Sequence, residues 1–294
     1  MIPSSFVLML AFVTNVQSLS VSDGIKRKIE WDTLKIRWGP DPSVSNDEVY
    51  VRQPRTVQQA LQEQYKPLLD TLGEQCVGKT TIGYRYWKGN DTGAILIFDK
   101  QGTIAGVQIA FPRSSIKGNH YSFGTQKMFN TEMINGIAMY TLTAYFIEPP
   151  LICTVGRTLS QLEREGTGTG LFLQNGTNPM IDSIELPLWE NDMGKTKWVK
   201  GGCFKTMGDY FFFSQSSFFS AHHDHLKFKG QLSGFGWAIV ANLNFSRRTE
   251  RVLTPAISTF LIPVPTCIPK LNDELGGFTT QHIYFNTNPA NLEC

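Results

Sequence analysis

The sequence predicts a mainly β protein built from antiparallel sandwich or barrel modules, with one or two short helices. After Gly78, short runs of apolar and β-branched residues follow one another, each bounded by Gly, Pro or Asn. That many short strands at this spacing are typical of sandwiches and barrels. The chain has 294 residues, of which 41% are hydrophobic, 12% aromatic and 18% charged, so a globular protein with a sizeable core is expected.

The first element is an apolar run, Phe6–Val13, followed by small residues at Val16 and Ser18. This pattern is typical of a secretory signal peptide, and we expect cleavage near Ser18. The run is too short to cross a bilayer, and no later stretch approaches the roughly 18 apolar residues of a membrane helix. A secreted, extracellular protein without a membrane anchor is therefore expected. The alternative for this run is a buried N-terminal strand.

A helix is expected next, because Thr56 can cap a segment from Val57 in which apolar residues recur at helical spacing as far as Tyr65. Pro67 interrupts the pattern, and the leucines of 68–72 are expected to resume it for one turn. The other expected elements are a second short helix over Leu159–Glu165 and strands over Thr81–Trp87, Ala94–Phe98, Thr103–Phe111, Ala138–Ile147, Gly170–Gln174, Tyr210–Phe213, Trp237–Leu243, Ala256–Ile262 and Ile283–Phe285.

An internal repeat connects the two halves of this β-rich region. Gly102–Ala110 lines up with Gly230–Ala238, and Phe146, Pro149 and Cys153 line up with Phe260, Pro263 and Cys267. The predicted organisation is a signal peptide at 1–18, an N-terminal segment with the helix at 19–78, a first β module at 79–175 and a second at 176–294. Chance convergence of two hairpin patterns is the alternative.

In an exported protein, sequons can carry N-linked glycans and cysteines can form disulfides. Asn90, Asn175 and Asn244 each begin an Asn-X-Ser/Thr triplet, so surface loops with N-linked glycans are expected there. The five cysteines favour two disulfides with one thiol left over, and the connectivity stays open. The disulfide candidates are Cys76, Cys153, Cys203 and Cys267. Cys294 is the odd one, which could link two chains as a dimer.

Two glycine-rich segments resemble nucleotide-binding motifs without their context. Gly73–Thr80 matches the P-loop pattern, but a helical segment precedes it and a strand-like segment follows, the reverse of the order that a phosphate site needs. Gly166–Leu171 has Leu where the dinucleotide fingerprint needs its third Gly, so a tight loop entering a strand is expected. A nucleotide or flavin cofactor is therefore not expected. A net charge of +2 likewise gives no indication of a nucleic-acid partner.

The histidine cluster at 222–225 is the densest group of metal-capable and titratable side chains. On a strand, His223 and His225 would share one face, where they could accept a proton from a substrate or hold Zn²⁺ or Cu²⁺. A solvated turn is the third reading. We expect His223 and His225 to be catalytic and expect no resident metal.

The segment that precedes these histidines is unusually aromatic. The run Tyr210–Phe213 has Trp198 and Trp237 as neighbours in the predicted sheets, and such a set can line a cavity for a flat, apolar ligand. The candidate substrate-binding residues are Trp198, Phe211, Phe213 and Trp237. A core where two sheets meet is the alternative. The sequence holds no GxSxG elbow and no HExxH helix, which disfavours the common secreted hydrolases.

Five stretches of this chain together resemble secreted glycoproteins of marine invertebrates, among them the luciferase of syllid fireworms. The resemblance covers roughly residues 30–290 and is carried by Tyr86–Gly89, Ile97–Gly106, Thr143–Cys153, Gly166–Leu171 and Gly202–Gly208. It implies a secreted oxidoreductase, a luciferase-like monooxygenase, that lets O₂ attack a small conjugated substrate in a dry pocket without an organic cofactor. It assigns no catalytic residues. A non-catalytic ligand-binding or extracellular matrix glycoprotein is the competing class.

Overall fold

The computed structural model confirms a mainly β protein with antiparallel sheets and a few short helices. It describes residues 7–15, 34–37, 50–68, 76, 81–89, 94–115, 129–186, 189–196, 198–204, 208–213, 230–239, 250–252 and 278–285. The chain divides into two compact units. Unit 1 contains Gln53–Leu186. Unit 2 contains the strands described on either side of that segment.

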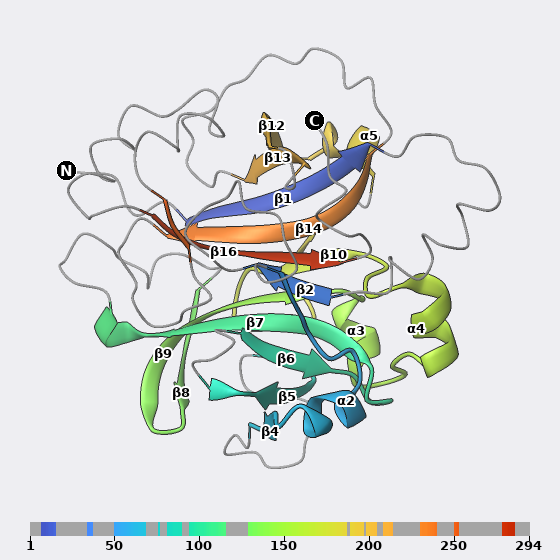
Figure 1. The fold of residues 1–294 in the computed structure, drawn as a ribbon, viewed down its shortest axis with the longest axis vertical. Helices are drawn as coiled ribbons and strands as arrows, with labels where there is room; N and C mark the ends of the chain where they lie inside the picture. Colours follow the sequence, from blue (N-terminus) through green and yellow to red (C-terminus); the bar gives the residue numbers. More distant parts are fainter. Residues whose placement is uncertain are drawn as a thin grey trace. The chain divides into compact units, whose positions relative to one another are not determined.

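Unit 1 is built on an eight-stranded antiparallel sheet with the order β11-β10-β9-β7-β6-β5-β4, in which β8 also pairs with β9. Figure 1 shows β9, β7, β6 and β5 following one another across this sheet. The strands are β4 (Lys66–Pro67), β5 (Tyr84–Trp87), β6 (Ala94–Phe98), β7 (Ile104–Pro112), β8 (Asn130–Ile134), β9 (Ile137–Tyr145), β10 (Leu171–Gln174) and β11 (Ser183–Leu186). Every residue of β6 is buried, which explains its unbroken apolar sequence.

The helical segments among the described residues of unit 1 are α2 (Val57–Gln62), a 3₁₀ turn η2 (Arg113–Ser115), α3 (Pro149–Ile152) and α4 (Leu159–Glu165). The Thr56 side chain caps α2, as predicted, by accepting from the Gln59 amide. The predicted helix α4 is also confirmed, and Thr158 and Gln161 form its capping box. The predicted resumption of helix after Pro67 is wrong at its start, because Leu68 follows strand β4 and its amide bonds to the Arg85 carbonyl.

A buried carboxylate, Asp99, ties the β6–β7 hairpin to the segment between α3 and α4. It accepts hydrogen bonds from the amides of Gln101 (2.9 Å), Thr103 (3.0 Å) and Arg157 (2.7 Å). The Arg157 guanidinium in turn donates to the carbonyls of Ile104, Gly166 and Thr167, and burial lowers its pKa. The glycine-rich segment at 166–170 is therefore a loop held by Arg157 at the entrance to β10, as the sequence predicted.

Unit 2 contains a second eight-stranded antiparallel sheet, with the order β12-β13-β1-β14-β16-β2-β3, in which β15 also pairs with β16. Its strands are β1 (Val7–Asn15), β2 (Leu34–Arg37), β3 (Tyr50–Arg52), β12 (Trp198–Phe204), β13 (Gly208–Phe213), β14 (Gly230–Ile239), β15 (Glu250–Val252) and β16 (Phe278–Phe285); a short helix, α5 (Glu190–Met193), precedes β12. The apolar run near the N-terminus is thus the strand β1 in this structure, which is the alternative that the sequence left open. Cleavage near Ser18 stays a prediction.

The two sheets repeat each other strand by strand. The order β11-β10-β9-β7-β6-β5-β4 corresponds to β3-β2-β16-β14-β1-β13-β12, and the side strand β8 corresponds to β15. The registers agree as well: Asn130 pairs with Thr141 as Glu250 pairs with Thr280. The two sheets are therefore of the same design, and unit 2 takes β1, β2 and β3 from residues that the sequence prediction placed outside both β modules.

The closest agreement surrounds one glycine in each sheet. Gly106 of β7 pairs with Tyr145 of β9, and Gly234 of β14 pairs with Tyr284 of β16. A Cβ atom on Gly106 would lie 2.5 Å from the Ala144 carbonyl oxygen, and one on Gly234 would lie 2.5 Å from that of Ile283. In both sheets a register shift lies just before the glycine, between Ile104 and Gly106 and between Leu232 and Gly234. The first part of the sequence repeat is thereby confirmed.

The second part of the sequence repeat is wrong. The strand that corresponds to β9 is β16, so Phe146 corresponds to Phe285 rather than to Phe260. Residues 253–277, which include the strand expected over Ala256–Ile262, lie outside the described residues. The expected start at Trp237 is also wrong, since β14 begins at Gly230. The module boundary expected after Asn175 falls in the β10–β11 hairpin, whereas unit 1 extends to Leu186.

One of the expected disulfides is present, between Cys76 and Cys153, with Cα atoms 5.6 Å apart. Cys76 belongs to the P-loop-like segment Gly73–Thr80, and Cys153 follows α3 directly. Cys203 lies in β12, and Cys267 and Cys294 fall outside the described ranges.

We predict that Gly106→Ala and Gly234→Ala each lower the free energy of unfolding by about 1–3 kcal/mol, because the new methyl group meets a backbone oxygen of the neighbouring strand. Urea denaturation measures the loss. Thr131→Ala, at an exposed position of β8, is the control and should change stability by less than about 0.5 kcal/mol. Unchanged stability in both glycine variants would contradict the close packing.

Candidate functional site

A buried polar cluster crosses the sheet of unit 1. We define this polar cluster as Thr81, Arg85, Gln108, Glu132 and Thr143; all except Glu132 are buried, and Glu132 is half-buried. β5, β7, β8 and β9 supply four of its members, and Thr81 lies just before β5. Gln108 stands out within the otherwise apolar strand β7, because a polar side chain in such a strand needs partners for its amide.

Gln108 is the centre of this cluster. Its Nε2 donates to Thr81 Oγ1 (2.8 Å) and Glu132 Oε1 (2.9 Å), and it also lies 3.2 Å from Thr143 Oγ1. Its Oε1 accepts from Arg85 Nη1 at 3.0 Å. The amide thus reaches four side chains that are far apart in the sequence.

Arg85 and Glu132 form the one ion pair of the cluster. Arg85 Nη1 donates to Glu132 Oε2 at 2.7 Å, and their side chains are 6% and 12% exposed. Burying such a pair is tolerable only where further hydrogen bonds satisfy the charges, which Gln108 provides to both partners. The charged groups of the cluster are therefore paired with each other and with Gln108, as is typical of a polar group that stabilises a protein interior.

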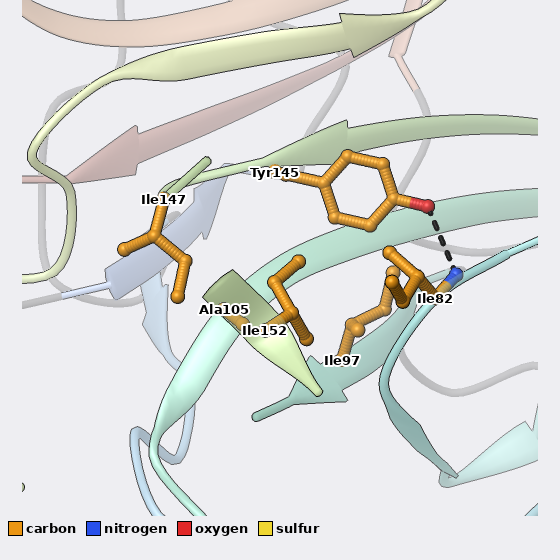
Figure 2. Packing of buried hydrophobic residues seen from close by; sticks show 6 residues of the cluster. All are labelled: Ile82, Ile97, Ala105, Tyr145, Ile147 and Ile152. Carbon is orange, nitrogen blue, oxygen red and sulfur yellow. Dashed lines mark hydrogen bonds between the residues drawn. The ribbon is translucent and has the colours of Figure 1, made fainter. Parts of the chain in front are cut away.

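The Tyr145 hydroxyl extends the polar network beside this cluster. It accepts from the Ile82 amide at 3.2 Å and donates to Gln174 Oε1 at 2.9 Å. Figure 2 shows the Tyr145 ring beside Ile82 and Ile97, in a cluster that also contains Ile152. Burial raises the pKa of this phenol well above its usual value. Tyr145 therefore stays neutral and acts as a donor and acceptor within the core.

The corresponding positions of unit 2 carry different chemistry. His282 stands where unit 1 has Thr143, Gly236 stands where it has Gln108, and Tyr284 stands where it has Tyr145. His282 is 3% exposed, and a Cβ atom on Gly236 would lie 2.6 Å from its Cδ2. The missing side chain at Gly236 thus gives the imidazole its space. Sequence reasoning did not select His282; its signal is a titratable residue inside the apolar end of β16.

The predicted substrate-binding residues occupy neighbouring positions of the unit 2 sheet. One register row runs through Trp198, Phe213, Met9, Trp237 and Gln281. The fourth candidate, Phe211, lies two residues along β13 from Phe213, at a position of the same parity. The register therefore brings all four predicted positions onto one face. We call this set the aromatic row.

Two members of the aromatic row have described side chains. Trp237 is completely buried and its Nε1 donates to Gln281 Oε1 at 3.3 Å, while Trp198 is 5% exposed. His282 follows Gln281 directly and therefore belongs to the opposite face of β16. The aromatic row and the buried histidine thus lie on the two faces of the same sheet.

The remaining predicted site residues are distributed differently. His223, His225, Asn90 and Asn244 lie outside the described residues, so their roles stay predictions. Asn175 lies in the β10–β11 loop, half-buried, with its amide bonded to the Asp182 carbonyl. A search of the described part of the chain finds no group of three or more potential metal ligands. None of the helices described is long and apolar enough to cross a membrane.

Comparisons of the chain with protein-family models, with curated proteins and with solved structures gave no match in any of the three.

We predict that Tyr145 makes stability fall as the pH rises above about 10, the pKa of a free tyrosine. In that range the unfolded chain loses the phenol proton while the folded chain keeps it, so unfolding becomes more favourable. Urea denaturation at increasing pH checks this. In Tyr145→Phe, the stability is lower at neutral pH because two hydrogen bonds are lost, and its decline above pH 10 is less steep. An equal slope in both proteins would contradict the assignment.

We also predict that Glu132→Ala destabilises the protein by about 3–5 kcal/mol, because it leaves the buried Arg85 guanidinium without its charged partner. Glu185→Ala, an exposed carboxylate on β11, is the matched control and should cost less than about 0.5 kcal/mol. The double variant Arg85→Met/Glu132→Leu should recover part of the loss. Equal losses of stability in Glu132→Ala and Glu185→Ala would contradict a buried pair.

Proposed function

We propose that this chain is a secreted glycoprotein that oxidises a small, flat, conjugated molecule with O₂ and without an organic cofactor, as the resemblance to the syllid fireworm luciferase implies. The observation that supports it is the aromatic row of unit 2. Trp198 pairs with Phe213, and Met9, which lies within the predicted signal peptide, pairs with both Phe213 and Trp237. Phe211 lies at a position of the same face. Aromatic residues at positions of one face are the kind of set that can stack on a planar apolar substrate.

The chemistry proposed needs one base and a dry site. The base takes a proton from an acidic C–H bond of the substrate, and the carbanion forms a C–O bond with O₂. The substrate carbon is oxidised, O₂ is reduced to the peroxide level, and the proton goes to the terminal oxygen, giving a hydroperoxide. His223 and His225 are the proposed bases, since imidazole titrates near neutrality. Breakdown of that peroxide is the step that emits light in a luciferase-type reaction.

The competing proposal is a ligand-binding or extracellular matrix glycoprotein without catalysis. It is favoured by the polar cluster of unit 1, in which Arg85, Gln108 and Glu132 use their polar atoms on one another. Such an interior stabilises a fold and leaves no group for a substrate. Under this proposal the aromatic row holds a small molecule that leaves unchanged, or belongs to the core, and Cys294 links two chains.

We predict that the chain, expressed in a secretory host, consumes O₂ or emits light with members of a panel of flat conjugated heteroaromatic compounds. His223→Gln/His225→Gln should then lower the rate by at least about 100-fold while the affinity for the compound stays within about threefold, because proton transfer rather than binding is lost. An oxygen electrode and photon counting measure the rate, and quenching of tryptophan fluorescence measures the affinity.

The control is His120→Gln, a histidine from another part of the sequence, which should leave the rate unchanged. Mass spectrometry of the same secreted protein checks for an N-terminus near Leu19 and for glycans on Asn90, Asn175 and Asn244. Binding without turnover would favour the competing proposal. Full turnover in the double variant would reject these histidines as the base.

A further inference from the structure

We propose that two copies of this chain exchange the hairpin β2–β3, so that β2 of each chain pairs with β16 of the other in a swapped dimer. The partner is therefore a second copy of this chain. The inference goes beyond the proposed oxidation and depends on no part of it. It is supported by the fact that the two halves of the single chain have already exchanged equivalent hairpins.

The elements of the chain occur twice in the same order. A hairpin, β2–β3, is followed by helix α2 and the strands β4 to β9, and a second hairpin, β10–β11, is followed by helix α5 and the strands β12 to β16. β1 fills the position equivalent to β6 and precedes both series. The chain therefore contains two repeats that each begin with a hairpin. We call them repeat A, from β2 to β9, and repeat B, from β10 to β16.

The two hairpins have the same register on their sheets. Phe172 of β10 pairs with Tyr145, and Lys35 of β2 pairs with Tyr284, the tyrosine equivalent to Tyr145. This register also matches the apolar anchors of the two hairpins. These anchors are at most 1% exposed: Leu34 and Ile36 in β2, and Leu171 and Leu173 in β10.

The chain also leaves the two hairpins in the same way. Arg52 of β3 pairs with Lys35, and Glu185 of β11 pairs with Phe172, so Arg52 and Glu185 are equivalent. A helix begins five residues after each of them, α2 in one case and α5 in the other. A proline stands two residues after each of them in the sequence, Pro54 and Pro187. The equivalence therefore extends from the hairpins into the following helices.

Each repeat pairs its hairpin with the last strand of the other repeat. β2 belongs to repeat A and pairs with β16 of repeat B, whereas β10 belongs to repeat B and pairs with β9 of repeat A. This reciprocal exchange of equivalent elements is a domain swap within one chain. The last strand of a repeat thus accepts a hairpin from another repeat. The β2–β3 hairpin of a second copy presents the identical residues to β16.

The connection between this hairpin and unit 1 has no spare length. β3 ends at Arg52, and Gln53 already belongs to unit 1, where its Oε1 accepts from the Tyr65 hydroxyl at 2.7 Å. The Arg55 carbonyl then accepts from the Ile104 amide at 2.9 Å. A connection this short favours exchange between chains, because it restricts how the hairpin can fold back onto its own chain. The bond between Arg52 and Gln53 is the hinge of the exchange.

The contacts of the hairpin are the same in the single chain and in the swapped dimer. In both, β2 pairs with a β16 strand and buries Leu34 and Ile36. The balance is therefore set by the effective concentration of the chain's own hairpin, which is of the order of 1 mM for tethered segments. Because each chain gives one hairpin and receives one, the dimer closes with twofold symmetry. It separates slowly, since β2 must first leave the sheet.

The first experiment holds the full chain at about 1 mM in urea just below its unfolding midpoint, dilutes it into buffer and counts dimers by native mass spectrometry. We expect at least about a tenth of the chains to be dimeric. Insertion of about ten Gly and Ser residues between Arg52 and Gln53 should lower this fraction at least about threefold. The matched control places the same insertion between Asn135 and Gly136, at the exposed β8–β9 turn, and should leave the fraction unchanged.

The second experiment identifies the exchanged strand by disulfide cross-linking. Ile36 and Ile283 are buried and pair across β2 and β16. Paired residues of antiparallel strands have Cα atoms about 4.5–5.5 Å apart, which suits a disulfide. The double variant Ile36→Cys/Ile283→Cys should form this link within one chain in dilute solution. A mixture of the Ile36→Cys chain with an isotope-labelled Ile283→Cys chain, treated as above, should form it between two chains, as peptide mapping can show.

Three results would overturn the proposal. The first is a chain that stays monomeric under these conditions. The second is a dimer that is equally abundant in both insertion variants and lacks the link between positions 36 and 283 of different chains, which would show association through another surface. The third is a double variant that forms no link within one chain, which would contradict the pairing of β2 with β16.

Discussion

The sheets of this protein depend on one close contact that occurs twice, a tyrosine paired across the sheet with a glycine. Gly106 faces Tyr145 and Gly234 faces Tyr284, with both phenol rings completely buried. Because a Cβ atom at either glycine would meet the neighbouring backbone, the ring and the register shift beside it set how β7 and β14 lie against their partners. In unit 1 the same tyrosine reaches Ile82 and Gln174, which joins the sheet to the segment before β5 and to β10.

The parts of this fold with strong local patterns could be predicted from the sequence. The all-apolar strand Ala94–Phe98 and the capped helix Leu159–Glu165 have the bounds that their sequences indicated. Short strands with charged residues, such as Leu34–Arg37 and Asn130–Ile134, were missed, because their formation depends on partners that are far away in the chain. An apolar run such as Phe6–Val13 suits a signal peptide and a central strand equally well, so local chemistry alone could not separate the two.

The candidate sites show the same division. The aromatic positions of β12, β13 and β14 were found from composition, and pairing registers then brought them to one face. The polar cluster was not found, because Arg85, Gln108 and Glu132 come from three strands and only their pairing makes them neighbours. Gln108 within the apolar strand β7 and His282 within β16 were the available signals. The role of each of these two residues depends on which side chains the neighbouring strands place beside it.

The order of strands along the chain has a consequence for biosynthesis. The described part of unit 1 is one continuous segment, whereas unit 2 combines β1, β2 and β3, made before that segment, with β12 to β16, made after it. Unit 1 can therefore acquire its structure while the ribosome is still working, and the sheet of unit 2 must wait until β16 has emerged to receive β2. Closing so long a loop makes the second half slow to mature and exposes its early strands to unwanted partners meanwhile. Such a chain would benefit from chaperones during its synthesis.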